Sequence, residues 1–376
     1  DSADAILAAN QTDRVAAEGR GVAGALLDRL TLTPARIEAM AAGLGKLAAL
    51  PDPVGTQTGG WRMHNGIKVQ RERIPLGVVA VIYEARPNVT ADAAGLCLKS
   101  GNAALLRGSS EALQSNRAIG AALRNALASA GFPADAVQVL EDTSREGARA
   151  LMQAKEWVDL LVPRGGPGLI AADEAEATVP VVIDGAGNCH VYVDAAADLD
   201  VARRIVHNAK VQRPGVCNAA EKLLVHEAIA AAFLPDVVAD LRADGVEVRG
   251  DAAAREIVAD LVPADDADWP VEYLDLIMAV RVVDGVAAAV GHIRRFGTGH
   301  TEAIVTGDSQ AATEFVDGLD TAVVVVNAST RFTDGEEFGF GAEIGISTQK
   351  LHVRGPMGPE ALTSERYVLF GDGQTR

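Results

Sequence analysis

The sequence predicts an α/β protein with two parallel-sheet domains in series, and three observations support this. From residue 75 onward, short apolar runs alternate with alanine-rich helical stretches. The runs are apolar throughout, which is typical of strands in a parallel sheet that helices cover on both faces. The same alternation starts again after Pro214-Gly215, and a chain of 376 residues is long enough for two or three domains.

The composition excludes several functional classes. Hydrophobic residues make up 48% of the chain, too large a share for a disordered protein. The 34 basic and 51 acidic side chains give a net charge of -17, which argues against binding to nucleic acid or to an anionic membrane. No apolar run approaches the roughly 18 residues of a membrane-spanning helix, and three cysteines are too few for a disulfide framework. We therefore expect a cytoplasmic protein.

The chain starts with predicted helices, which a hairpin follows. Apolar residues recur at helical spacing in the first thirty residues, and Thr33-Pro34 is typical of a capped helix start. Two prolines and a glycine in residues 51–55 end this helix. Asn65-Gly66 lies between the alternating segments 61–64 and 67–70 and predicts a hairpin with a two-residue turn.

The remaining elements follow from the apolar pattern. The predicted strands are residues 77–83, 103–106, 137–140, 158–162, 181–182, 191–193, 223–226, 276–283, 303–306, 322–327 and 367–370. The clearest helices between them are residues 115–130, 229–241 and 308–318.

Cys217 is the candidate nucleophile. The sequence has no G-x-G-x-x-G after a strand, no G-x-x-x-x-G-K-[ST], no G-x-S-x-G and no C-x-x-C, and its seven scattered histidines predict no metal site. Cys217 follows a predicted helix and a Pro-Gly turn, where Lys210 and Arg213 would favour a thiolate. The alternative is a small buried hydrophobic residue, which is how we interpret Cys97 and Cys189.

Two arginine–glycine turns, Arg107-Gly108 and Arg164-Gly165, follow predicted strands. Ligands of open α/β sheets bind beyond the carboxyl ends of the strands, where arginine and backbone N–H groups can hold a phosphate. Each turn is equally compatible with a plain strand-to-helix connection. Asn88 also follows a strand and could donate to an oxyanion or act as a helix cap, and local chemistry leaves the roles of His300 and Glu302 open.

Taken together, several segments resemble the gamma-glutamyl phosphate reductases, also called glutamate-5-semialdehyde dehydrogenases, of the aldehyde dehydrogenase superfamily. In chain order they are residues 74–78 (IPLGV), 83–90 (YEARPNVT), 99–102 (KSGN), 107–108 (RG), 187–194 (GNCHVYVD), 212–218 (QRPGVCN), 300–304 (HTEAI) and 338–352 (FGFGAEIGISTQKLH). The resemblance covers nearly the whole chain. It also implies that the native chain extends ahead of Asp1.

The resemblance implies an aldehyde-dehydrogenase-like fold, with two parallel-sheet α/β domains plus a small β oligomerisation element. The cofactor-binding domain would comprise residues 1–58 and 75–212, and the catalytic domain residues 213–350. The hairpin at 59–74 and the C-terminal segment 351–376 would form the oligomerisation element of a homo-oligomer. The superfamily binds its nicotinamide cofactor without the usual glycine motif, so the absence of that motif is no objection.

The implied reaction is the NADPH-dependent reduction of gamma-glutamyl phosphate to glutamate-5-semialdehyde and phosphate, the second step of proline biosynthesis. Cys217 would form a thioester, and Asn88 and the Cys217 backbone N–H would form the oxyanion hole. The residues implied for cofactor binding are Lys99, Arg107, Ser109, Arg164, Gly165 and Glu272. Candidate substrate ligands, or else solvated loop residues, are Arg213, Ser329, Arg331 and Glu343. No metal is implied, and a glutamate 5-kinase is a candidate partner.

Three residues bear on the activity and the cofactor that the resemblance implies. Phe296 stands where we expect histidine or tyrosine. Asp184 stands where aldehyde oxidisers keep a glutamate that activates water, and its shorter side chain suits release of the thioester by hydride. Glu111 suits a free ribose hydroxyl and opposes a 2′-phosphate, so the NADPH preference rests on the resemblance. The rival functions are a hydrolytic aldehyde dehydrogenase and a non-catalytic assembly subunit.

The implied substrate and cofactor are both anions, whereas the chain is acidic. Basic side chains should therefore gather at the site. The candidates are Arg86, Lys99, Arg107, Arg164, Lys210 and Arg213.

Overall fold

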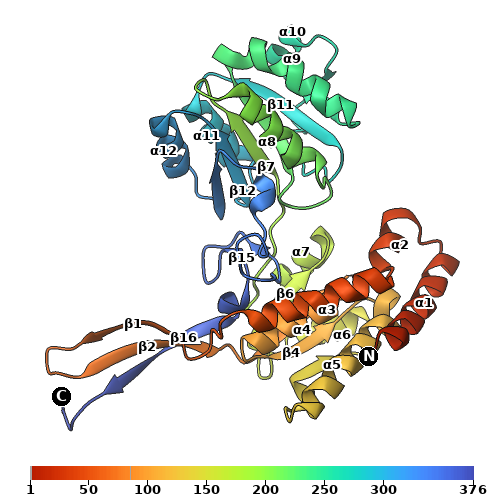
Figure 1. Ribbon diagram of the computed structural model, residues 1–376, viewed down its shortest axis with the longest axis vertical. Coiled ribbons are helices and arrows are strands. Elements are labelled where there is room, and N and C mark those ends of the chain that lie inside the picture. The colour runs from red at the N-terminus through yellow and green to blue at the C-terminus, as the bar shows by residue number, and fades with distance from the viewer. Residues whose placement is uncertain (1, 85) are drawn as a thin grey trace. The chain divides into compact units, whose positions relative to one another are not determined.

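The computed structural model describes residues 2–84 and 86–376, which form two compact units (Figure 1). Unit 1 contains the chain up to Asp184 together with Gly339–Gly345 and Met357–Arg376. Unit 2 contains Gly185–Phe338 and Ile346–Pro356. Each unit has its own parallel sheet, so the predicted α/β fold class is confirmed.

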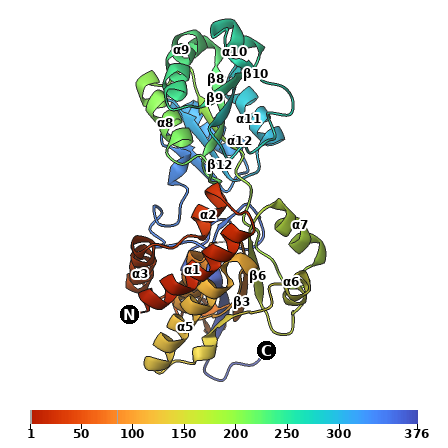
Figure 2. The same ribbon diagram turned by 90° about the vertical axis from the view of Figure 1, so that its right-hand side faces the viewer.

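Unit 1 is built around a four-stranded parallel sheet with the order β5-β4-β3-β6. Its strands are β3 (Val78–Tyr83), β4 (Ala103–Arg107), β5 (Val137–Val139) and β6 (Leu160–Arg164). Its helices are α1 (Ala3–Gly19), α2 (Gly24–Leu30), α3 (Pro34–Ala49), α4 (Asn88–Lys99), α5 (Leu113–Ser129), α6 (Arg145–Met152) and α7 (Pro167–Glu176). Figure 2 shows α6 and α7 on one side of this sheet and α1, α3 and α5 on the other. Helices on both faces explain why the central strand β3 is apolar and buried along its length.

A buried amide joins the N-terminal helices. Asn10 Nδ2 donates to the Leu30 carbonyl at 2.8 Å and to Ser115 Oγ at 3.1 Å, while its Oδ1 accepts from Leu32 N at 2.8 Å. The predicted cap of α3 is confirmed, because Thr33 Oγ1 accepts the N–H of Arg36 at 3.2 Å and a proline follows at the first helical position.

An antiparallel sheet of three strands carries the hairpin. It consists of β1 (Gln57–Arg62), β2 (Lys68–Pro75) and β16 (Thr363–Phe370), in the order β1-β2-β16. The hairpin is confirmed, but its turn is longer than two residues, because Gly66 N donates to the Met63 carbonyl at 3.0 Å and the last strand pair is Arg62 with Lys68. Trp61 and Tyr367 are 53% and 59% exposed on this sheet.

Unit 2 is built around a seven-stranded parallel sheet with the order β10-β9-β11-β8-β7-β12-β13. Its strands are β7 (Cys189–Val193), β8 (Ala220–His226), β9 (Glu247–Gly250), β10 (Val262–Pro263), β11 (Ile277–Val283), β12 (Thr301–Val305) and β13 (Val323–Val326). Its helices are α8 (Leu199–Val211), α9 (Glu227–Ala243), α10 (Ala252–Ile257), α11 (Val286–Phe296) and α12 (Ser309–Gly318). A two-residue antiparallel pair, β14 (Ile346–Ser347) with β15 (Gly355–Pro356), lies in the same unit.

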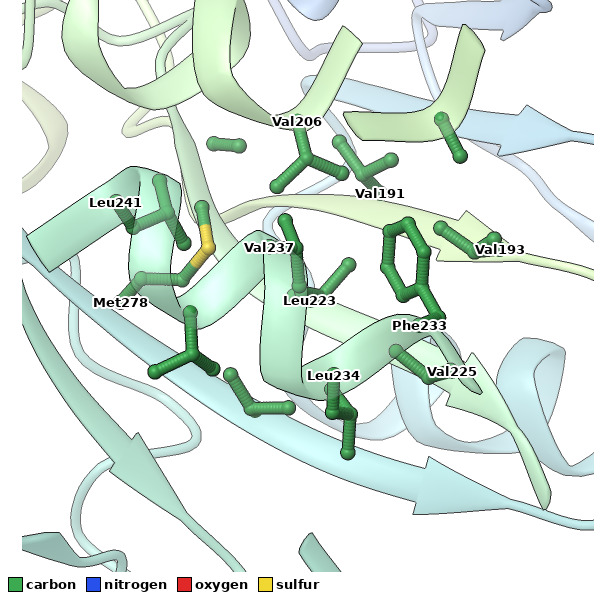
Figure 3. Close-up of a cluster of buried hydrophobic side chains, with 14 of the residues drawn as sticks. Val191, Val193, Val206, Leu223, Val225, Phe233, Leu234, Val237, Leu241 and Met278 are labelled. Carbon is green, nitrogen blue, oxygen red and sulfur yellow. The ribbon is translucent and has the colours of Figure 1, made fainter. Parts of the chain in front are cut away.

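Two hydrophobic clusters cover the two faces of this sheet. One joins the strands to α8 and α9, and Figure 3 shows its centre, with Leu223 of β8 facing Phe233 and Val237 of α9. The other joins them to α11 and α12, where Tyr192 and Phe315 stack with ring centroids 6.1 Å apart. Unit 2 begins at Gly185, earlier than the expected boundary at residue 213, because β7 pairs with both β8 and β12.

Two differences from the predicted strands have simple causes. Strand β9 and the edge strand β10 were not predicted, because β9 carries the polar residues Glu247 and Arg249 and β10 has only two residues. The predicted strand at 181–182 is a single bridge between Val181 and Leu161. Within residues 2–84 and 86–376, no helix has the length and apolar character needed to cross a bilayer.

Replacing Phe233 should test the core of unit 2. Phe233 is 1% exposed, so Phe233→Ala leaves a cavity and should lower the free energy of unfolding by about 3 to 5 kcal/mol. Phe132, which is 64% exposed, is the matched control, and Phe132→Ala should change it by less than about 0.5 kcal/mol. Urea denaturation followed by circular dichroism measures both, and equal effects would contradict the assignment of this core.

Candidate active site

Cys217 lies in the turn between α8 and β8, at the amino ends of the parallel strands of unit 2. The turn is half-buried at Cys217, whereas Cys97 and Cys189 are both 0% exposed. Burial raises the pKa of the Cys97 thiol to about 12 and holds that of Cys189 well above its ordinary value. Of the three cysteines, Cys217 is therefore the one that a reactant can reach.

A buried ion pair closes the base of this turn. Lys210 Nζ, near the end of α8, lies 3.0 Å from Glu221 Oε2 at the start of β8, and both side chains are 0% exposed. The second oxygen of Glu221 accepts the N–H of Leu274 at 3.2 Å. Lys210 was expected to promote a thiolate at Cys217, but its ammonium is engaged by Glu221. The pair instead fixes where the turn begins and ends.

Residues 187–189 connect the Cys217 turn to Glu272. A Cβ on Gly187 would lie 1.5 Å from the carbonyl oxygen of Cys217, so only glycine fits there. The N–H of Gly187 donates to Glu272 Oε1 at 2.7 Å. Two residues on, Cys189 Sγ donates to the same Cys217 carbonyl at 3.1 Å. The segment thus touches the candidate nucleophile and the candidate ribose-binding glutamate at once.

Asn188 holds residues 187–189 in place through hydrogen bonds. Its side chain is 0% exposed, and its Nδ2 donates to the carbonyls of Trp269 and Phe296, each at 2.8 Å. Its backbone N–H donates to Thr298 Oγ1 at 3.1 Å. Phe296, the unexpected aromatic residue, contributes its carbonyl here, and its ring packs on His292 with centroids 4.8 Å apart.

A layer of buried titratable groups lies under the segment. His190 Nδ1 lies 2.9 Å from Glu302 Oε2, which also accepts the backbone N–H of His190 at 2.8 Å. Burial holds the pKa of Glu302 well above its ordinary value, while burial and then the charge of Lys222 lower the pKa of His190 to about 3. Burial likewise lowers the pKa of Lys222, whose Nζ donates to Val271 O at 2.7 Å, to about 7. His190 is thus uncharged at neutral pH, and burial favours the uncharged form of Glu302.

Asn88 is the first residue of α4 in unit 1, and its side chain is exposed. Its Nδ2 donates to Asp92 Oδ2, one helical turn further on, at 3.0 Å. Burial raises the pKa of Asp92, with the Asn88 hydrogen bond and the charge of Arg164 opposing it. The amide thus lies at the carboxyl end of β3.

Lys99 and Arg107 are both held by carbonyl oxygens. Lys99 Nζ donates to Leu50 O at 2.6 Å and to Ala48 O at 3.3 Å, beyond the C-terminus of α3. Arg107 Nη2 donates to the carbonyls of residues 143 and 144 at 2.5 and 2.9 Å. Arg107 Nε is buried without a hydrogen-bond partner among the described residues. Buried atoms of this kind are commonly met by ordered water or a bound group.

Glu111 follows in a short 3-10 helix after β4. Burial opposes its ionisation, but hydrogen bonds from its own backbone and from Ser109, with the charge of Arg20, outweigh burial and hold its pKa below the ordinary value. Glu111 is therefore a carboxylate at neutral pH.

The second arginine–glycine turn follows β6. Arg164 Nη1 pairs with Asp184 Oδ2, so the Asp184 carboxylate is held by a guanidinium. A Cβ on Gly165 would lie 2.8 Å from Leu169 and 2.9 Å from Glu84, and Gly166 N donates to Glu84 Oε2 at 3.1 Å.

The four candidate substrate ligands lie in different places. Arg213 is exposed in the Cys217 turn. Arg331 Nε donates to Gln212 Oε1 at 2.7 Å, beside the same turn, and its N–H donates to Ser329 Oγ at 3.3 Å. Glu343 belongs to unit 1. The structure thus brings three of the four to the Cys217 turn.

Sequence reasoning missed Gly187, Asn188 and Glu221. The first two lie in a segment that carried the resemblance, but their spacing matches no general motif. Glu221 lies inside an apolar strand, where a charged residue is rare unless it is paired, and this was the available signal. Within the described part of the chain, no group of three or more His, Cys, Asp and Glu side chains could hold a metal ion.

Comparisons with known proteins agree with this architecture. The model of the aldehyde dehydrogenase family matches residues 48–256, more than half of the chain. The gamma-glutamyl phosphate reductase of Moorella thermoacetica is 59% identical over 373 residues, which cover 99% of this chain and 89% of that protein. That of Syntrophomonas wolfei is 55% identical over 371 residues, covering 99% and 88%.

A solved structure supports the same family. The crystal structure of gamma-glutamyl phosphate reductase from Thermotoga maritima superimposes with a TM-score of 0.97 at 50% identity, covering 99% of this chain and 90% of that one. The chain is therefore an oxidoreductase of the aldehyde dehydrogenase family and belongs to its gamma-glutamyl phosphate reductases.

Proposed function

We propose that the protein reduces gamma-glutamyl phosphate to glutamate-5-semialdehyde and phosphate with NADPH, through a thioester on Cys217, as the second step of proline biosynthesis. The observation that carries the proposal is the Cys217 turn. Its thiol is the accessible one of three, and its carbonyl is held from two sides by Gly187 and Cys189. The names of the relatives supply the substrate.

The proposed reaction uses Cys217 twice. Its thiolate attacks the acyl carbon, the bond from that carbon to the phosphate oxygen breaks, and phosphate leaves with the electron pair. A nicotinamide cofactor, when bound, supplies the hydride that reduces the thioester carbon. Collapse of the resulting thiohemiacetal breaks the C–S bond, restores the thiolate and releases the aldehyde.

Asn88 and the backbone N–H of Cys217 are the proposed donors to the oxyanion that forms in both halves of the reaction. The Asn88 amide is exposed at the start of α4, and its hydrogen bond to Asp92 uses one of its two N–H groups. A second N–H therefore remains for a substrate oxygen.

The proposed cofactor ligands are Lys99, Arg107, Ser109, Arg164, Gly165 and Glu272. The buried atom Arg107 Nε, which has no hydrogen-bond partner among the described residues, fits a polar group bound at the end of β4. Gly165 keeps the turn after β6 free of a side chain, and Glu272 is oriented by Gly187. We propose that unit 1, which holds all of these residues except Glu272, forms the cofactor-binding domain and that unit 2 forms the catalytic domain.

The remaining proposals concern the oligomeric state, the partner and the location of the protein. The exposed Trp61 and Tyr367 rings, with centroids 6.0 Å apart, support the three-stranded sheet as the oligomerisation element of a homo-oligomer. An acyl phosphate is short-lived in water, so a glutamate 5-kinase that delivers it directly is the candidate partner. Few cysteines and an acidic composition support a cytoplasmic location.

A phosphate-dependent assay tests the proposed reaction. In the reverse direction, the protein should oxidise glutamate-5-semialdehyde with NADP only when phosphate is present, because phosphate is the group that releases the thioester. Cys217→Ser should lower kcat at least about 1000-fold, since a hydroxyl is a poor nucleophile here. Cys97→Ser, at a buried thiol in unit 1, is the matched control and should retain activity.

Two outcomes would count against the proposal. Turnover without phosphate would point to a hydrolytic aldehyde dehydrogenase. No turnover under any condition, together with an unreactive Cys217, would point to a non-catalytic assembly subunit.

Glu111→Gln tests the cofactor preference. The Glu111 carboxylate would repel a 2′-phosphate, so removing its charge should raise the ratio of kcat/KM for NADP over NAD by about three- to tenfold. Glu141→Gln removes an exposed carboxylate of the same unit, paired with Arg117 at 3.2 Å, and should leave the ratio unchanged. A lower ratio in Glu111→Gln would place this carboxylate away from the phosphate.

Arg331→Ala tests the substrate-binding assignment. An arginine bound to the α-carboxylate should raise the KM for glutamate-5-semialdehyde by about ten- to a hundredfold when it is removed, with the KM for NADP unchanged. Arg354→Ala, which breaks a pair with Asp320 in the same unit, is the control. An unchanged KM for the aldehyde in Arg331→Ala would remove Arg331 from the substrate site.

A further inference from the structure

We propose that the buried thiol of Cys189 is a positioning group for the nucleophile: it donates to the carbonyl of Cys217 and holds the turn in its reactive orientation. This inference rests on the proposed role of Cys217. Cys189 itself touches no reacting atom, so it acts only through the backbone of the turn.

The first support is the contact itself. Cys189 Sγ lies 3.1 Å from the carbonyl oxygen of Cys217 and 3.8 Å from His300 Nδ1. Burial, and then the charges of Glu302 and Cys217, hold the pKa of Cys189 well above its ordinary value. The thiol therefore keeps its proton at working pH and remains a donor.

The second support is that the carbonyl cannot move toward the 187–189 segment. The Cα of Gly187 lies against it, with no room for a Cβ. Asn188 fixes the segment through three hydrogen bonds, to Trp269 O, Phe296 O and Thr298 Oγ1. The Cys217 carbonyl has backbone packed against it and accepts from the Cys189 thiol, so loss of the thiol removes a directional restraint on the turn.

The third support is that Gly187 and Cys189 bind two different residues. Gly187 N–H binds Glu272 Oε1 at 2.7 Å, whereas the Cys189 thiol binds Cys217 O. Loss of the thiol should therefore disturb the nucleophile and leave the glutamate in place. The expected signature is a change in kcat with no change in the KM for the cofactor.

The test compares Cys189→Ala, Cys189→Ser and Cys97→Ala in the full-length protein. Alkylation by iodoacetamide in the native state, followed by intact mass, measures the reactivity of Cys217, because Cys97 and Cys189 are both 0% exposed. Cys97→Ala is matched in volume and burial but lies in unit 1. This readout needs neither substrate nor cofactor, so a wrong assignment of the reaction would not obscure it.

We expect Cys189→Ala to slow alkylation and lower kcat by about two- to tenfold, the factor that one ordinary hydrogen bond is worth, with the KM for NADP within about twofold. Cys189→Ser, which restores a donor, should recover at least half of the loss on a logarithmic scale, and Cys97→Ala should match the parent. Alkylation that is unchanged or faster in Cys189→Ala, or equally slow in Cys97→Ala, would overturn the proposal. If Cys189→Ala does not fold, Cys189→Ser remains as the test. Complete loss of Cys217 alkylation in Cys189→Ser would then overturn the proposal.

Discussion

The buried ion pair between Lys210 and Glu221 is the interaction on which the arrangement around Cys217 depends. It joins the last turn of α8 to the second residue of β8, so it sets the span that the intervening turn must cross. Removing one partner would leave the other charged and buried, at a cost of about 3 to 5 kcal/mol. Because Glu221 also accepts the N–H of Leu274, the same carboxylate positions the segment that carries Glu272. One buried pair thus fixes two parts of the site whose positions along the chain are far apart.

Near this pair, burial acts on several titratable groups. It lowers the pKa of His190 to about 3 and raises that of Glu302, whose Oε2 lies 2.9 Å from His190 Nδ1. Oriented dipoles act strongly in such a buried region, because little solvent screens them. In the roles that we propose, the Cys189 thiol and backbone N–H groups act on the Cys217 turn as oriented dipoles, whereas the charge of Lys210 is compensated by Glu221.

The sequence predicted the fold class and most strands correctly, because a short apolar run between helical stretches seldom forms anything other than a buried strand. It missed β9, since its polar residues interrupt the apolar pattern, and it made the hairpin turn too short, since Asn-Gly suits several loop lengths. It singled out Cys217 from its surroundings as the candidate nucleophile, which stays a prediction, yet it misread Lys210, whose partner lies eleven residues away on another element. Gly187 and Asn188 could not be found from local pattern, because their roles depend on contacts with residues far along the chain.

The basic side chains of this acidic chain differ in the partners that hold them. Arg164 and Lys210 face carboxylates, so each of these charges is compensated by the chain itself. Lys99 and Arg107 are held by carbonyl oxygens, which carry no formal charge, although Asp142 lies close enough to Arg107 to interact with it. Among the described residues, Lys99 and Arg107 thus keep positive charge with no counter-charge bonded to them. The two cations lie at opposite edges of the unit 1 sheet, because α4 connects the parallel strands β3 and β4 and so ends at the edge where β4 begins. In an acidic protein, a cation such as Arg107 at the carboxyl edge favours a phosphorylated ligand there, because the rest of the surface repels anions in general.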